Sequence, residues 1–402
     1  MRVLQAPSNI ANQAWAMAQG LRAHGHQVQV WQYGGAGYGF PADRLVEHGD
    51  GPSSYLRILY EAVAEEFDVV HFHFARSLVP AASRLPWFWD LPVWRALGVK
   101  VVFTFHGSDV RLRSHHLEAD PWSFYRYADV PCDEDRIAAQ LAVIRTYADR
   151  LTVGSVLHKA YVPEAVLLAK AVEASRLPAV GPVHRRRPVV VHAPSLRSTK
   201  GTELILAGFD RLREAGVDFE VDLVEDVSHE ELLARVARAD VVVEKLLGDD
   251  IGVGSLEAMA MGKVAVSRIR PEARAAAPAL PSVDADPETF VEVMAALLVA
   301  PDRRSELGEA GRAYVLAHHD APVVGRHLEE LYADITPRGL PHIAPGWTAP
   351  NVHARLEKAQ EAVRSLTAQN TVLRSAVRSA ALRDRLVDAG RAVASVRRRL
   401  HR

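Results

Sequence analysis

The chain has 402 residues, of which 49% are hydrophobic and 24% charged, and its 48 basic and 49 acidic residues nearly cancel. These proportions are typical of globular proteins and exclude a disordered chain, a collagen-like chain and a disulfide-rich mini-protein. Because Cys132 is the only cysteine, no intramolecular disulfide can form, and we expect a reducing, cytoplasmic location. No run of about 18 apolar residues occurs, so we expect any membrane contact to be peripheral.

Short apolar runs alternate with amphipathic segments along the first half of the chain. This alternation predicts parallel strands covered by helices. The expected strands are Val3–Leu4, Val28–Tyr33, Val69–Phe74, Val101–Phe105 and Leu151–Val153, and the expected helices are Ala14–His24, Ser54–Glu66 and Asp133–Ala148. We assign residues 1–180 to a first Rossmann-like domain.

The same rhythm restarts after an irregular connection that contains Pro163, Pro178, Pro182 and three successive arginines. The expected strands are Val189–His192, Phe219–Val224, Val241–Glu244 and Val264–Ser267, and the expected helices are Gly201–Ala215, Glu230–Ala239, Gly254–Met261 and Pro287–Leu298. Residues 181–336 then form a second Rossmann-like domain, whose last helix is a candidate to cross back to the first. The predicted fold is α/β, with two doubly wound domains that face each other across a cleft and bind ligands at the carboxyl ends of their strands.

The C-terminal tail differs from the rest of the chain. A proline-rich linker, residues 337–350, precedes a segment, residues 351–402, with 12 basic and 4 acidic residues. Its apolar residues recur with the 3,4 spacing of a coiled-coil seam, and the polar Asn370 falls in the same register. This pattern favours a helical tail that forms a homodimer. The alternative is one amphipathic helix docked on the body. The net charge of +8 favours an anionic membrane surface over nucleic acid, since no groove-reading motif accompanies it.

The most informative stretch is residues 249–263, in which a glycine-containing loop leads directly into a short helix. The backbone N–H groups of Gly254 and Ser255 would lie at the helix N-terminus, where they attract an anion such as a diphosphate. Glu257, near the first turn, can accept hydrogen bonds from two vicinal hydroxyls such as those of a ribose. The alternative is that Ser255 and Glu257 only cap the helix.

This stretch resembles the carboxylate-x7-carboxylate signature of the family 4 retaining glycosyltransferases of GT-B fold. The matching positions are Gly252, Glu257, Ala258, Met259, Ala260 and Gly262. Asp249 stands where the family has its first glutamate, eight residues before Glu257. The resemblance spans most of residues 1–335.

Three further segments support the resemblance in the expected order. The loop that contains Asn12 and Gln13 is similar to the family loop that approaches donor phosphate and acceptor. His106, in Thr104–Asp109, is similar to the donor-site histidine; the alternative is a loop histidine bonded to backbone. Lys200 and Gly201 are similar to the phosphate clamp, although Ser195 occupies the usual arginine position and Arg197 is the candidate replacement.

The resemblance implies transfer of a sugar from a nucleoside-diphosphate sugar to an acceptor hydroxyl with retention of configuration. It also implies that this reaction needs no metal or other cofactor. Arg197, Lys200 and the amides at Gly254 and Ser255 would hold the diphosphate, and Glu257 the ribose. Asp249 and His106 would contact the sugar. By analogy we expect a glycan or lipid-linked acceptor in surface polysaccharide or glycoconjugate synthesis.

Other motifs and functions compete with this interpretation. Asp133-Glu134-Asp135 has the form of a metal-binding motif but also opens a helix, so capping is favoured. His71 and His73 share one strand face, where lining the cleft is favoured over binding a metal. The glycines at 34–39 lack the spacing of a dinucleotide-binding loop. A nucleotide-sugar 2-epimerase and a non-catalytic coiled-coil protein with a degenerate nucleotide site remain the alternative functions.

Overall fold

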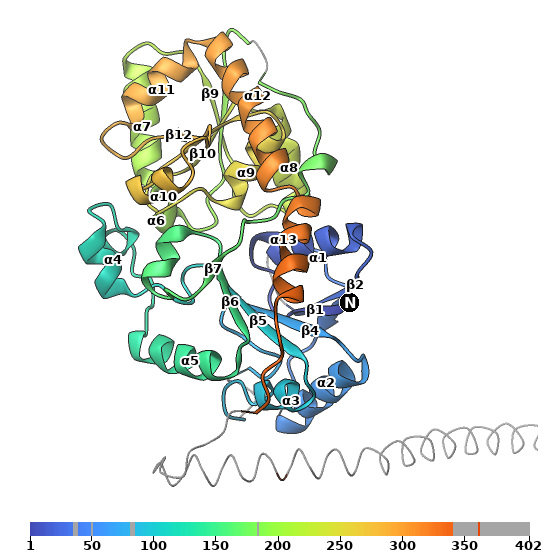
Figure 1. Cartoon of the computed structure of the whole chain (residues 1–402). Helices are drawn as coiled ribbons and strands as arrows, with labels where there is room; N and C mark the ends of the chain where they lie inside the picture. Colours follow the sequence, from blue (N-terminus) through green and yellow to red (C-terminus); the bar gives the residue numbers. More distant parts are fainter. Residues whose placement is uncertain (35–38, 50, 81–84, 183–184, 341–360, 362–402) are drawn as a thin grey trace, which may run out of the picture. The chain divides into compact units, whose positions relative to one another are not determined.

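The computed structural model describes residues 1–340 apart from 35–38, 50, 81–84 and 183–184, together with Glu361. The predicted linker beyond residue 340 and the predicted coiled coil therefore lie almost entirely outside the described residues. Residues Met1–Leu340 form one unit with two parallel sheets and their covering helices (Figure 1). No helix in the described part of the chain combines the length and the apolar character that crossing a bilayer requires.

The first sheet has seven strands in the order β3-β2-β1-β4-β5-β6-β7, and all pairs are parallel. The strands are β1 (Arg2–Ala6), β2 (Gln27–Tyr33), β3 (Arg44–Val46), β4 (Val69–His73), β5 (Lys100–Phe105), β6 (Arg150–Val153) and β7 (Val166–Leu167). The accompanying helices are α1 (Gln13–Ala23), α2 (Pro52–Ala64), α3 (Leu91–Ala96), α4 (Arg113–Ala119) and α5 (Glu134–Tyr147), with 3-10 turns η1 (Ile10–Asn12), η3 (Phe124–Arg126) and η4 (Val156–Ala160). All five predicted strands and all three predicted helices are confirmed. The edge strands β3 and β7 were not predicted because two or three residues carry no periodic signal.

The second sheet has five parallel strands in the order β12-β11-β10-β8-β9. The strands are β8 (Val189–His192), β9 (Glu220–Leu223), β10 (Val241–Lys245), β11 (Val264–Ser267) and β12 (Val283–Asp284). The helices are α6 (Arg197–Lys200), α7 (Thr202–Glu214), α8 (His229–Arg238), α9 (Val253–Ala260), α10 (Pro271–Ala276) and α11 (Phe290–Leu298), and the turn η5 (Ala174–Arg176) precedes them. The four predicted strands are confirmed, and the predicted pair of doubly wound domains is the observed architecture.

The carboxyl ends of the strands carry the predicted site residues. His106 follows β5 directly, Lys200 ends the short helix after β8, and Asp249 lies in the loop after β10. Doubly wound sheets bind ligands at these ends. At the start of α5, the Asp133 carboxylate accepts a hydrogen bond from the backbone N–H of Arg136 (3.0 Å), which confirms the capping interpretation of the Asp133 motif.

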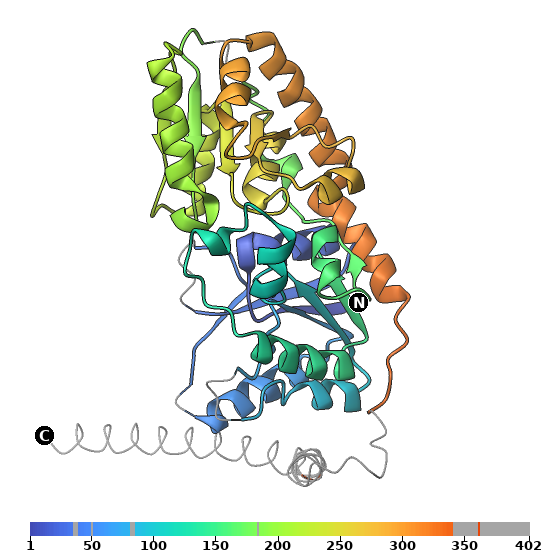
Figure 2. The same ribbon diagram turned by 90° about the vertical axis from the view of Figure 1, so that its left-hand side faces the viewer.

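The last two helices connect the second domain back to the first. α12 (Pro301–His318) packs on α9, and α13 (Ala321–Ala333) packs on α1. In both views the chain passes from the upper domain down to the lower one along these helices (Figures 1 and 2). A Cβ at Gly20 would lie 2.0 Å from the carbonyl oxygen of Ala321, and one at Gly325 would lie 2.3 Å from the carbonyl carbon of Gly20. The close contact of α13 with α1 therefore requires both glycines.

Candidate active site

The loop that starts at His106 fixes the backbone of this residue. The Asp109 carboxylate accepts hydrogen bonds from the backbone N–H groups of His106 (3.0 Å) and Gly107 (2.7 Å). Nε2 of His106 lies 3.0 Å from Nδ1 of His73. Burial and the nearby charge of Lys170 lower the pKa of His106 to about 4. His106 is therefore neutral at physiological pH and meets a ligand as an uncharged hydrogen-bonding group.

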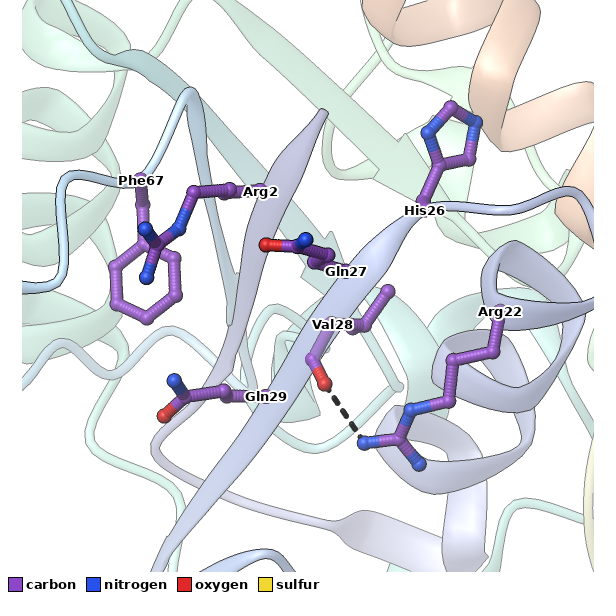
Figure 3. A pocket seen from close by; sticks show the side chains of 7 residues that line it. All are labelled: Arg2, Arg22, His26, Gln27, Val28, Gln29 and Phe67. Atoms are coloured by element: carbon purple, nitrogen blue, oxygen red, sulfur yellow. Dashed lines mark hydrogen bonds between the residues drawn. The ribbon is translucent and has the colours of Figure 1, made fainter.

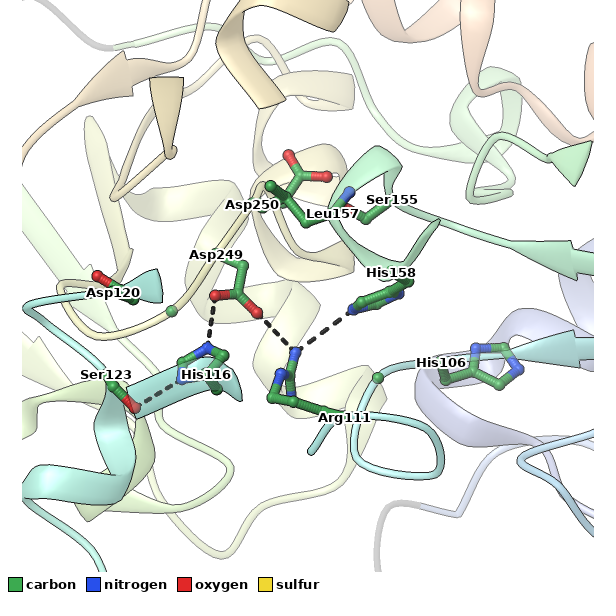
Figure 4. A network of polar contacts seen from close by, with 12 residues as sticks. His106, Arg111, His116, Asp120, Ser123, Ser155, Leu157, His158, Asp249 and Asp250 are labelled. Carbon is green, nitrogen blue, oxygen red and sulfur yellow. Dashed lines mark hydrogen bonds and ion pairs between the residues drawn. The ribbon is translucent and has the colours of Figure 1, made fainter. Parts of the chain in front are cut away.

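Asp249, from the second domain, is held by side chains of the first (Figure 4). Nη2 of Arg111 donates to Oδ2 at 2.8 Å, and Nε2 of His116 lies 2.7 Å from Oδ1. Burial alone would raise the pKa of Asp249, but the hydrogen bond from His116 and the charge of Arg111 hold it well below its usual range. Both oxygens are engaged, so a sugar contact by Asp249 would share or displace one of these partners.

A second buried ion pair joins the same two domains. The Arg268 guanidinium donates to both oxygens of Asp120, at 2.6 and 2.8 Å. His116, Asp120 and Asp249 bring their ligand atoms within 4.8 Å of one another, which is close enough for a shared metal ion. However, each carboxylate already faces a guanidinium, so a cation would have to displace an arginine. This set of side chains fits an interdomain latch better than a metal site.

Glu244 occupies the anion-attracting end of α9. Its Oε2 accepts hydrogen bonds from the backbone N–H of Gly252 (2.8 Å) and from Oγ of Ser255 (2.6 Å), and its Oε1 accepts one from Nζ of Lys200 (3.0 Å). Burial opposes ionisation, but Lys200 and Lys245 hold the pKa of Glu244 well below its usual range. A Cβ at residue 252 would lie 1.8 Å from Oε1, so any larger residue there would displace the Glu244 carboxylate from this position. The protein's own carboxylate thus takes part of the place predicted for a phosphate.

Glu257 lies in α9 beside a histidine. Its Oε1 is 2.7 Å from Nε2 of His229, the first residue of α8. Burial would lower the pKa of His229, but the hydrogen bond and charge of Glu257 raise it above its ordinary value. The second oxygen of Glu257 makes no hydrogen bond to any residue that the structure describes. Space beside Gly254 is open, because a Cβ there would meet nothing within 4 Å.

The cations divide into two groups. Lys200 reaches Glu244 at the end of α9, and Lys170 donates to the carbonyl oxygen of Ile251 (2.8 Å) in the same loop. Arg197 instead pairs with Glu203 (2.8 Å) and with Glu225 (2.8 Å). The structure therefore brings Lys200 to Glu244 at the end of α9, whereas Arg197 is paired with two other carboxylates.

The two predicted residues of the N-terminal loop lie differently. Asn12 accepts a hydrogen bond from Nδ2 of Asn9 (3.2 Å) and has a left-handed backbone conformation (φ 60°). Gln13 is 2% exposed, and its amide bonds the Ala171 carbonyl oxygen (2.8 Å) and N–H (2.9 Å). The Gln13 side chain therefore ties α1 to the chain segment that leads to the second domain, and offers no free group to a donor.

Two family models match the two domains. Residues 10–133 match "Glycosyltransferase Family 4", and residues 182–329 match "Glycosyl transferase-like". This chain belongs to the family 4-like glycosyltransferases of GT-B fold. Among curated proteins, none is similar enough to count as a match.

Solved structures similar to this glycosyltransferase share its fold at low sequence identity. Sucrose-phosphate synthase from Thermosynechococcus elongatus is 14% identical with a TM-score of 0.59, over 83% of this chain and 98% of that one. HepE from Anabaena, in complex with UDP-glucose, is 9% identical with a TM-score of 0.56, over 83% and 99%. WaaG, a glycosyltransferase involved in lipopolysaccharide biosynthesis, is 13% identical with a TM-score of 0.53, over 83% and 100%. These likenesses establish the GT-B fold.

A cavity of about 350 Å³ lies next to Asp249 in this glycosyltransferase, between α4, η4 and α10. Its lining is His115, His116, Ala119, Val156, Leu157, Ala160, Tyr161, Asp249, Arg270 and Glu272. A second cavity, of about 280 Å³, lies at the amino ends of β1 and β2 (Figure 3). Its arginines are already paired, Arg2 with Glu65 and Arg22 with Asp43. Ligands of doubly wound sheets bind at the opposite, carboxyl ends, so the first cavity belongs to the candidate site and the second does not.

Sequence reasoning missed several residues of the site. Arg111 and His116 follow the His106 segment closely, but nothing in their spacing indicates a partner 138 or 133 residues away. His229 gave no signal as the partner of Glu257. Glu244 could have been found, since a charged residue at the carboxyl end of an apolar strand lies where such sheets bind ligands.

Proposed function

We propose that this glycosyltransferase moves a sugar from a nucleoside-diphosphate sugar to an acceptor hydroxyl with retention of anomeric configuration. The observation that carries the proposal is the meeting of Lys200, the amino end of α9 and Glu257 at the carboxyl ends of the second sheet. From the first domain, Arg111 reaches Asp249 of the second domain, and His106 lies in the same close-up (Figure 4). HepE, which has the same fold, binds UDP-glucose, and this supports a nucleotide-sugar donor here.

The donor would be held through its ribose and its diphosphate. The unpaired oxygen of Glu257 can accept a hydrogen bond from a ribose hydroxyl, while His229 keeps the carboxylate in place. Lys200 and the backbone N–H groups near Gly254 can face the diphosphate, which needs positive charge as its bond to the sugar breaks. Glu244 competes for Lys200, so we expect the diphosphate to share this lysine with it.

Retention without a protein nucleophile is favoured by the pairing of the carboxylates. Asp249 is held by Arg111 and His116, and Glu244 by Lys200, Gly252 and Ser255. A paired carboxylate with a depressed pKa is a poor nucleophile. In a same-face reaction the departing phosphate oxygen takes the proton of the acceptor hydroxyl, and the protein contributes position and charge.

We also propose a role for the protein in surface polysaccharide or glycoconjugate synthesis, with a glycan or lipid-linked acceptor. WaaG, of the same fold, is involved in lipopolysaccharide biosynthesis. The basic tail, residues 351–402, would pair two copies and bring the site to an anionic membrane surface.

The test is to incubate the purified protein with UDP-, GDP-, ADP- and dTDP-sugars, with and without a lipid extract. Release of nucleoside diphosphate that depends on the extract, with a product of unchanged anomeric configuration by proton NMR, is the expected result. Glu257→Gln serves as the matched variant with weakened donor binding. Release or rearrangement of the donor that needs no acceptor would instead indicate an epimerase, and no nucleotide binding at all would refute the proposal.

A further inference from the structure

A continuous chain of buried hydrogen bonds runs from His106 into the core beneath α13. It joins side chains of β1, β4, β5 and β6 to Tyr332 of α13, in the order His106, His73, Gln5, Tyr332, His71, Thr104, Thr152. Apart from His106, these side chains are at most 2% exposed. The expectation that His71 and His73 line the cleft is therefore wrong, because α13 covers that face and each of their ring nitrogens has a hydrogen-bond partner in the chain.

The donor–acceptor distances along this chain of hydrogen bonds lie in the ordinary range for hydrogen bonds. Nε2 of His73 lies 2.6 Å from Oε1 of Gln5, and Nε2 of Gln5 donates to the Tyr332 hydroxyl at 3.2 Å. That hydroxyl lies 2.6 Å from Nδ1 of His71, whose Nε2 is 2.6 Å from Oγ1 of Thr104. Oγ1 of Thr104 lies 2.6 Å from Oγ1 of Thr152.

With the protonation states of these groups, the hydrogen bonds of this chain can all run from donor to acceptor in one of two directions. Burial lowers the pKa of His71 to about 3, and burial and the neighbouring histidines lower the pKa of His73 well below its usual value. Burial also raises the pKa of Tyr332. At physiological pH every imidazole then carries one N–H and every hydroxyl keeps its proton. Each group donates to one neighbour and accepts from the other.

The far end of the chain selects the direction. Oγ1 of Thr152 donates to the backbone carbonyl oxygen of Phe103 (3.2 Å), and a carbonyl can only accept. Thr152 must then accept from Thr104, Thr104 from His71, and His71 from Tyr332. The Gln5 amide has the same polarity, since it donates to Tyr332 and accepts from His73.

We propose that this chain, anchored on the Phe103 carbonyl and passing through Tyr332, holds His106 in the tautomer with its proton on Nε2 and a lone pair on Nδ1. Tyr332 is then a positioning residue for the site. Nδ1 of His106 has no hydrogen-bond partner within the described part of the chain, so it can accept a hydrogen bond from a substrate hydroxyl. The inference rests on the proposed function where it assigns that hydroxyl to the transferred sugar.

The experiment reads the tautomer directly and needs no substrate. In protein labelled with 15N-histidine, long-range proton–nitrogen spectra distinguish a protonated ring nitrogen from an unprotonated one, and loss of signals in His106→Gln assigns the residue. We expect one tautomer in the wild type, with Nε2 protonated. Tyr332→Phe breaks the chain and should give a mixture of both tautomers.

Tyr55→Phe is the matched control, because Tyr55 is 1% exposed and its hydroxyl also contacts a histidine, His48, at 3.3 Å, outside the chain. It should leave the His106 signals unchanged. With an active donor, Tyr332→Phe should lower kcat/KM by up to about twofold, as the fraction in the competent tautomer falls toward one half. Its affinity for the nucleoside diphosphate alone should stay at the wild-type value.

Nδ1 of His106 protonated in the wild type, or unchanged His106 signals in Tyr332→Phe, would overturn the proposal. If Tyr332→Phe does not fold, Thr152→Val at the far end of the chain should shift the same equilibrium, and no shift would overturn the proposal equally. The predicted tautomer in a protein without transferase activity would refute the proposed function and support this inference.

Discussion

Glu244→Gln is expected to destabilise the protein and to strengthen nucleotide binding. The Glu244 carboxylate is 7% exposed and accepts hydrogen bonds from Gly252, Ser255 and Lys200. Glutamine has nearly the same shape, but it loses the charge and presents an N–H group to one of these donors. Since hydrogen bonds to charged groups contribute about 1.5–3 kcal/mol each, losing one or two should lower the free energy of unfolding by about 2–4 kcal/mol.

The effect on binding has the opposite sign. A diphosphate at Lys200 would lie near the Glu244 carboxylate, and two like unit charges about 8 Å apart repel each other by about 2 kcal/mol at an effective dielectric constant of about 20. A difference of about 1.4 kcal/mol is tenfold in affinity. Glu244→Gln should therefore bind a nucleoside diphosphate at least about tenfold more tightly at low salt, and the gain should shrink as salt is added.

Urea unfolding and titration calorimetry with UDP, GDP, ADP and dTDP measure the two effects, and Glu203→Gln, in the ion pair of Arg197, is the matched control. Because the pKa of Glu244 is depressed in the folded state, its contribution to stability is present above the ordinary glutamate pKa and is lost as the pH falls through the folded value. The stability difference between wild type and variant should thus be constant between about pH 6 and 8. A variant of unchanged stability that binds nucleotides more weakly would refute the reasoning, and would show that Glu244 itself holds the donor.

Other changes should separate the remaining assignments. Glu257→Gln should weaken nucleotide affinity by about 2 kcal/mol or more, through loss of a charge-assisted ribose contact, while unfolding stays cooperative; unchanged affinity by calorimetry would contradict the assignment. Lys200→Met should lower the rate about a hundredfold, whereas Arg197→Met should have a small effect in the same donor-release assay, because Arg197 pairs with Glu203 and Glu225; equal losses would contradict this distinction. Gly20→Ala should lower the urea midpoint strongly, since its Cβ would lie 2.0 Å from a carbonyl oxygen of α13; a wild-type midpoint would disprove close packing. Deleting residues 351–402 should convert a dimer into a monomer by light scattering and abolish sedimentation with anionic vesicles; a full-length monomer, or a truncated protein that still sediments with vesicles, would refute the tail assignment.

Much of the fold could be predicted from the sequence because its information is local. Buried parallel strands need continuous apolar runs, and Val189–His192 and Val264–Ser267 have the predicted bounds in the structure. The predicted helices also end within a few residues of their observed ends, because the pattern that predicts them is local as well. The strands β3 and β7 were not predicted, because very short strands lack periodicity. The bounds of α13 were not predicted, because its place depends on its contact with α1.

Part of the site could also be predicted, because a residue's position relative to a strand end is local information. His106, Lys200, Gly252 and Glu257 were identified through segments that resemble the family motifs, and the structure shows them after β5, after β8 and at the start of α9. Their roles in binding a donor stay predictions.

Only the tertiary structure decided which partners these side chains have. Asp249 and Arg111 are 138 residues apart in the chain, and His71 and Tyr332 are 261 apart. No periodicity or spacing encodes such pairs, because they depend on how two domains and a returning helix pack. The same packing turns Gln13 and Arg197 toward protein groups, fills the end of α9 with Glu244, and sets the direction of the hydrogen bonds behind His106.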